Sequence, residues 1–130
     1  MTIDQSLGEI ADSMGIRLTE ATADRTVATM PVPGNRQRHG ILHGGASALL
    51  AETVGSVAAS LHAGDGRFIV GLELNISHHR SISDGVITAT ATALSRGNTI
   101  ASYQIEITND QGHRISTGRL TCLVRERRGS

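Results

Sequence analysis

The chain has 130 residues, of which 38% are hydrophobic and 18% charged, so it can bury most of its apolar surface in one folded domain spanning residues 1–130. Its 12 basic residues, all arginine, are balanced by 12 acidic ones, which argues against nucleic acid as a partner. A lone cysteine, Cys122, cannot form an internal disulfide, and the polar first ten residues lack a signal-peptide pattern, so we expect a cytoplasmic protein.

The first predicted element is a short amphipathic helix over residues 2–15. Thr2 can cap this helix, Gln5 completes a capping box three residues later, and Gly15 ends it. Apolar residues share one face of the helix: Ile3, Leu7, Ile10 and Met14. The alternation of Thr, Val and Ala over residues 20–32 then predicts one strand.

A long, nearly uncharged helix follows the glycine pair Gly44-Gly45. Residues 46–62 contain no proline, and their only formally charged side chain is that of Glu52. Apolar residues recur at helical spacing, so we expect the helix to be largely buried. A membrane span needs about 20 apolar residues, and this stretch is shorter and carries a carboxylate at its middle. The sequence therefore predicts no membrane helix here.

Four more strands are predicted, over residues 67–80, 86–94, 99–108 and 113–124. The short segments between them are rich in turn-forming residues, which favours hairpins and an antiparallel meander; they are residues 83–85, 95–98 and 109–112. This order predicts an α+β fold in which a curled antiparallel sheet wraps around one long central helix. The arginines of the tail are expected to lie in a frayed end: Arg125, Arg127 and Arg128.

Glu52 is the first candidate for chemistry. An isolated carboxylate in an apolar helix costs several kcal/mol unless it is neutralised, paired or open to a cleft, and small residues flank it on the helix. The alternative is a glutamate on a solvent-facing stripe, and we favour the functional role. Ser56, one turn later, either positions a water or that carboxylate, or fills a tight helix contact.

The glycine pair before the helix is the second candidate. Unpaired N–H groups at a helix start can donate to an oxygen that gains negative charge, which together with a carboxylate suggests acyl transfer. Gly44 and Glu52 are eight residues apart, about 12 Å along a helix, so one carbonyl carbon cannot comfortably touch both. We therefore predict a homodimer in which the donor of one subunit faces the carboxylate of the other.

Several histidines and one amide lie near these candidates. Gln37 and His43 are in the loop that enters the helix, where they can bind a carbonyl or hold the loop, whereas His39 is expected to be solvated. No metal site is predicted from the adjacent His78 and His79, because neighbouring strand residues face opposite ways and no Asp or Cys completes a ligand set.

The turn over residues 96–99 combines an arginine with free backbone N–H groups that could bind phosphate. An ordinary solvated turn is the alternative.

These residues together resemble a known family. Gln37 followed by HGILHGGASALLAETVGSVAAS closely resembles the hotdog-fold acyl-CoA thioesterases of the 4-hydroxybenzoyl-CoA and phenylacetate-pathway group, and the HGG-x6-E-x3-S pattern is specific. The resemblance continues through GLELNISHHRS and SYQIEITNDQGHRIS, and is nearest to members that hydrolyse aromatic acyl-CoAs, including 1,4-dihydroxy-2-naphthoyl-CoA. It implies hydrolysis to a carboxylic acid and coenzyme A without a metal or redox cofactor, by homodimers that commonly pair into homotetramers.

The resemblance also implies roles for individual residues. Glu52 would attack the thioester carbonyl or activate water, the Gly44 N–H would be the oxyanion donor, and Ser56 would help to place the hydrolytic water. Gln37 and His43 would orient the thioester carbonyl. The coenzyme A nucleotide would be lined by His78, Arg80, Gly97, Asn98 and Thr99. The alternatives are a non-catalytic acyl-CoA-binding domain and a dehydratase, although the D-x-N-P-x-H pattern of one dehydratase group is absent.

Overall fold

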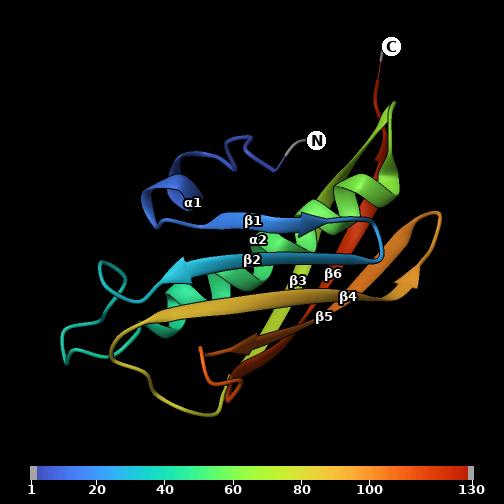
Figure 1. Cartoon of the computed structure of the whole chain (residues 1–130). Coiled ribbons are helices and arrows are strands. Elements are labelled where there is room, and N and C mark those ends of the chain that lie inside the picture. Colours follow the sequence, from blue (N-terminus) through green and yellow to red (C-terminus); the bar gives the residue numbers. More distant parts are fainter. Residues whose placement is uncertain (1–2, 129–130) are drawn as a thin grey trace.

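The computed structural model describes residues 3–128, so the expected helix cap at Thr2 lies outside the described residues. The elements in this range are α1 (Glu9–Ser13), β1 (Arg17–Ala21), β2 (Arg25–Pro31), α2 (Gly44–Ala63), β3 (Arg67–His78), β4 (Val86–Arg96), β5 (Ile100–Thr108) and β6 (Arg114–Glu126). The strands form one antiparallel sheet in the order β1-β2-β4-β5-β6-β3. The sheet curves around α2 (Figure 1), which confirms the predicted α+β architecture.

Helix α2 forms the centre of the core and begins two residues earlier than expected. His43 caps it, because its Nδ1 accepts a hydrogen bond of 2.8 Å from the N–H of Gly45. Fully buried apolar side chains face the sheet: Leu50, Ala51, Val54, Ala58 and Ala59. Gly55 lets β6 approach closely, since a Cβ there would lie 2.7 Å from Cδ2 of Leu120. No helix within the described part of the chain is long and apolar enough to cross a membrane.

The single strand predicted over residues 20–32 is wrong, because the chain reverses within it to form β1 and β2. Thr22 closes the turn with both its side chain and its backbone. Its hydroxyl oxygen accepts a hydrogen bond from the Arg25 N–H at 2.9 Å, and its backbone N–H donates to the Arg25 carbonyl at 2.9 Å. No glycine or proline marks this turn in the sequence, so alternation alone did not reveal it.

The expected meander is confirmed for β4, β5 and β6, which pair in succession. The hairpin predicted at residues 83–85 is wrong, because β3 pairs with β6 at the far edge of the sheet and not with β4. The β3–β4 connection instead binds the loop before α2: Leu42 N–H donates to the Ile82 carbonyl at 2.8 Å, and Val32 N–H to the Gly85 carbonyl at 2.9 Å. Because β3 comes last in the sheet order, next to β6 alone, it is an edge strand of the described sheet.

The amino-terminal helix is much shorter than the predicted 2–15. Gly8 has φ 102° and ψ 164°, outside the helical region, so the helix begins only at Glu9; Asp12 in its first turn accepts hydrogen bonds from the Ser6 hydroxyl and the Leu7 N–H. Ile3 and Ile10 are consequently 50% and 61% exposed. Gly15 ends this segment as expected, with a φ of 77°.

The carboxy-terminal arginines are more ordered than predicted. Arg125 is paired with Phe68 across β6 and β3. The N–H of Arg127 donates to the Gly66 carbonyl at 3.0 Å, and its guanidinium lies 5.8 Å from the ring centre of Phe68. The expectation of fraying is therefore wrong for these two residues, because β6 is long enough to follow β3 to its start.

Candidate active site

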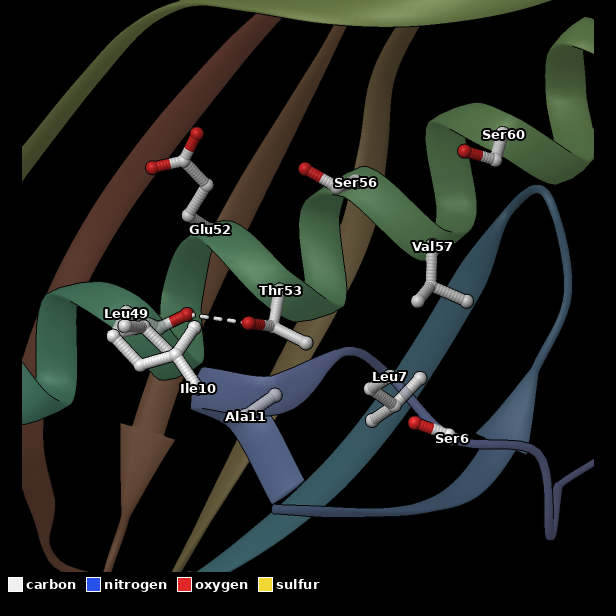
Figure 2. A pocket seen from close by; sticks show the side chains of 10 residues that line it. All are labelled: Ser6, Leu7, Ile10, Ala11, Leu49, Glu52, Thr53, Ser56, Val57 and Ser60. Carbon is white, nitrogen blue, oxygen red and sulfur yellow. Dashed lines mark hydrogen bonds between the residues drawn. The ribbon is translucent and has the colours of Figure 1, made fainter. Parts of the chain in front are cut away.

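Glu52 lies midway along α2 and lines a groove of about 470 Å³ between this helix and the amino-terminal segment. Figure 2 shows Leu7 and Ala11 on the side of α2 to which Thr53 and Val57 point, whereas the side chains of Glu52 and Ser56 project from the other side of the helix. The carboxylate of Glu52 is exposed in the single chain, and no residue within 3–128 gives it a hydrogen bond or ion pair. Helix α2 is thus largely buried, as expected, and its one carboxylate is open to a groove.

The carboxylate rests against a glycine of β3 that the sequence analysis missed. A Cβ added to Gly71 would lie 2.9 Å from Oε2 of Glu52, so any other residue here would displace the carboxylate. Gly71 also borders the bulge of β3, where the pairing with β6 shifts. An isolated glycine inside an apolar strand pattern is typical of such a close approach, and this signal was present in the sequence.

Ser56 lies one turn beyond Glu52, and Figure 2 shows the two side chains on the same side of α2. Ser56 is half-buried, and its hydroxyl has no hydrogen-bond partner among the residues that the structure describes. Thr53, in contrast, donates its hydroxyl proton to the Leu49 carbonyl at 2.7 Å. Ser56 is therefore free to bind a water or a polar group of a ligand beside Glu52.

The negative charge of Glu52 affects the pKa of Cys122 on β6. The thiol is fully buried, and burial together with the nearby carboxylate raises the pKa of Cys122 from about 9 to about 11. Because the unfolded chain loses this proton at a lower pH than the folded one, the free energy of unfolding should fall between pH 9 and 11, by up to about 1.4 kcal/mol per pH unit. Urea unfolding across this range should show a shallower decline for Cys122→Ala, and equal slopes would contradict the assignment.

The amino-terminal end of α2 forms a second site. The N–H of Gly45 is occupied by His43, whereas that of Gly44, the first helical residue, has no partner within the described chain. Gly44 lines a pocket of about 350 Å³ together with Gln37, Ser47, His78 and Arg80. A free N–H at the positive end of a 20-residue helix is a suitable donor for a negatively charged oxygen.

Side chains hold this pocket in shape. The ring of His78 lies beside Gly44, because a Cβ on that glycine would be 2.9 Å from Nε2 of His78, and Nδ1 of His78 is 2.9 Å from the Ser116 hydroxyl. The side-chain oxygen of Gln37 accepts from the N–H of His39, so the amide nitrogen of Gln37 remains available as a donor. His43 acts as the helix cap described above and does not line the pocket.

The structure divides the predicted site residues among three places. The groove with Glu52 and Ser56 shares no lining residue with the pocket at Gly44. The turn with Gly97, Asn98 and Thr99 lies at the other end of α2, where Nε2 of His62 is 2.7 Å from the Gly97 carbonyl. Within one chain, therefore, the carboxylate and the free helix N–H do not face a common atom. Nowhere in residues 3–128 do three His, Cys, Asp or Glu side chains gather as metal ligands.

Comparison with known proteins gives a consistent match over most of the chain. The sequence profile described as "Thioesterase superfamily" matches residues 39–116. The "Proofreading thioesterase EntH" of Cronobacter turicensis is 42% identical over 120 residues, which cover 92% of this chain and 88% of that protein.

Two solved structures are similar in both fold and sequence. Thioesterase HI1161 of Haemophilus influenzae superimposes with a TM-score of 0.89 at 36% identity, covering 95% of this chain and 88% of that one. A glutamine-to-alanine mutant of thioesterase PA1618 of Pseudomonas aeruginosa gives a TM-score of 0.88 at 36% identity, covering 92% and 88%.

Proposed function

The chain belongs to the thioesterase superfamily and is a thioesterase of the hotdog fold, and on this premise we propose that it hydrolyses an aromatic or short-chain acyl-CoA to the free acid and coenzyme A. The observation that carries the proposal is the unpaired carboxylate of Glu52, which is open to a groove in an otherwise apolar helix. Such a group is available to act on a bound thioester.

We propose that Glu52 drives the acyl transfer in one of two ways. As a general base, it takes a proton from water while the water oxygen attacks the thioester carbonyl carbon. As a nucleophile, it forms a mixed anhydride that water then hydrolyses. In both routes the C–S bond breaks, and coenzyme A leaves as a thiolate that takes up a proton. Ser56, one turn beyond Glu52, would hold the water.

The oxyanion formed during attack needs a donor, and the N–H of Gly44 is the proposed one. Such a donor is worth about 3 to 4 kcal/mol when it faces the developing charge. Gln37, with a free amide nitrogen, would orient the carbonyl from the same pocket, while His43 would fix the helix start. Since this pocket and the groove of Glu52 are separate in one chain, the proposed site combines two chains.

The edge strand β3 supports association into a homodimer. This 12-residue strand pairs only with β6 in the described chain, and a long unpaired edge is a template for another strand. It also exposes apolar side chains: Phe68 is 38%, Val70 44% and Leu72 55% exposed. We therefore propose that two copies join along their β3 strands, and that such dimers pair further into tetramers.

We propose a register for this pairing that would bring the two groups together. Glu52 lies against residue 71 of β3, and Gly44 lies against residue 78. Suppose that residue 71 of one β3 strand is opposite residue 78 of the other. The Glu52 carboxylate of one chain and the helix start of its mate would then lie over neighbouring strands, and neighbouring strands are about 4.8 Å apart. A thioester between them would meet both groups.

The nucleotide of coenzyme A is the proposed ligand of the remaining residues. His78 and Arg80 border the pocket at the helix start, where the guanidinium is suited to a phosphate. Gly97, Asn98 and Thr99 form an exposed turn at the other end of the helix. If the two-fold axis is perpendicular to the paired β3 strands, the two chains run antiparallel, and each proposed site can draw on the turn of one chain and the pocket of the other.

A thiol-release assay on the purified protein tests the proposed substrate class. We expect benzoyl-type and short-chain acyl-CoAs to be hydrolysed at least tenfold more efficiently, in kcat/KM, than a long-chain acyl-CoA, because small and polar side chains line much of the groove beside Glu52, among them Thr53, Ser56 and Ser60, and these favour a compact acyl group. Binding of acyl-CoA without release of thiol would contradict the proposal, as would a preference for long chains.

A further inference from the structure

His62, in the last turn of α2, uses both of its ring nitrogens to hold the β4–β5 turn. Nε2 lies 2.7 Å from the carbonyl oxygen of Gly97, and Nδ1 lies 3.1 Å from Nε of Arg96. The arginine always donates, so Nδ1 must accept, and the ring proton is then on Nε2 and is donated to Gly97. His62 therefore bonds to two consecutive residues at the start of the turn.

The arginine carries this link to a second hairpin. NH1 of Arg96 forms an ion pair of 2.8 Å with Oδ1 of Asp24 in the β1–β2 turn, and the Asp24 carbonyl accepts from the N–H of Ala93 at 3.0 Å. A chain of polar contacts thus runs from the β1–β2 turn through Arg96 and His62 to the Gly97 carbonyl.

Arg67 holds the same turn from its other side. Its Nε donates to the carbonyl of Ala63 at the end of α2 at 2.9 Å, and its NH1 donates to Oδ1 of Asn98 at 3.1 Å. Because the amide oxygen of Asn98 is bound, its amide nitrogen is directed away from Arg67. Neither this nitrogen nor the Thr99 hydroxyl has a partner in the described range. His62 and Arg67 therefore fix the turn to the end of α2, while the Asn98 amide nitrogen and the Thr99 hydroxyl stay available to a ligand.

We propose that His62 is a positioning residue that keeps the β4–β5 turn in the shape that receives the nucleotide part of coenzyme A. The inference rests on the proposed function, which assigns coenzyme A to this turn. A turn that is already held by side chains loses less conformational freedom when a ligand binds, so removing the support should weaken binding without touching the reacting atoms. The residue acts through Gly97 and Arg96 and does not contact the thioester.

The test compares an acyl-CoA with the matching acyl-pantetheine, which has the same thioester but no nucleotide. For His62→Ala we expect KM for the acyl-CoA to rise about tenfold, with kcat and both constants for the acyl-pantetheine changed less than about twofold. His62→Gln keeps a side-chain donor for the Gly97 carbonyl, so its KM for the acyl-CoA should be close to that of the unmodified protein. His113→Ala, an exposed histidine at the opposite hairpin, serves as the control and should leave KM unchanged.

The outcomes separate this inference from the proposed function. If the unmodified protein hydrolyses both thioesters with equal KM, the nucleotide is not recognised and the assignment of coenzyme A to the turn fails. If it prefers the acyl-CoA, but His62→Ala raises KM for both substrates alike or lowers kcat alone, the positioning role is overturned. A melting temperature for His62→Gln within a few degrees of the unmodified protein ensures that the comparison is made on folded enzyme.

Discussion

Glu52→Gln is expected to lower kcat by about a thousandfold or more while the protein stays folded and associated. The amide has nearly the same size and shape as the carboxylate, but it can neither accept a proton from water nor attack a carbonyl carbon, and such groups contribute about 10² to 10⁴ to the rate. Because the Glu52 side chain is exposed in the single chain and makes no hydrogen bond there, the change should not disturb packing.

The measurement is thiol release under saturating substrate, with size-exclusion chromatography to compare assembly. Glu106→Gln is a matched control, because it removes a carboxylate of the sheet whose one ion pair among residues 3–128 is with Arg114 at the surface, an interaction worth under about 1 kcal/mol. Its kcat should stay within twofold of the unmodified value. Near-normal hydrolysis by the Glu52 variant would refute the catalytic role of this residue.

Gly44→Pro is expected to reduce kcat by about 10² to 10³ relative to Gly44→Ala. Both changes add a Cβ that meets Nε2 of His78 at 2.9 Å, so the steric disturbance is common to the pair. Only proline also removes the N–H that we propose as the oxyanion donor, and loss of one such donor typically costs this factor. The comparison therefore removes this backbone donor while the contact of the added Cβ stays the same.

Proline fits this position, so the variant should fold. Gly44 is the first residue of α2, where proline is favoured because its missing N–H has no helical partner. The preceding His43 has φ −69° and ψ 129°, in the extended region that a residue before proline prefers. Circular dichroism and melting temperature should be alike for the two variants. Equal kcat values for them would show that this N–H does not stabilise the transition state.

The sequence predicted the local features of the fold well. The helix over residues 46–62 lacks charge except at Glu52, and it is the central helix α2. Turn residues at 95–98 and 109–112 marked two of the hairpins correctly. The β1–β2 turn was missed because the Thr22 side chain closes it without glycine or proline. The position of β3 was also missed, since strand order depends on contacts between distant segments.

The candidate site likewise divides into residues that local sequence features indicate and residues that depend on contacts between distant segments. Glu52, Ser56 and the glycine pair were singled out as candidates from their types and spacing on one helix. Gly71 and His62 were not, because each matters through a partner far along the chain: Gly71 through Glu52, and His62 through Arg96 and the Gly97 carbonyl. Spacing along a single element carries no information about such contacts, whereas the interruption of an apolar strand by glycine does give a hint.

The central claim is that Glu52 of one chain acts on a thioester held by the Gly44 N–H of its mate, and subunit mixing tests it most directly. Glu52→Gln and Gly44→Pro homodimers should each be nearly inactive. When the two variants are refolded together in equal amounts, random pairing gives one unmodified site in each mixed dimer, so about a quarter of the unmodified activity should return. Activity that stays at the level of the separate variants, with mixed dimers demonstrated by mass spectrometry, would contradict the account.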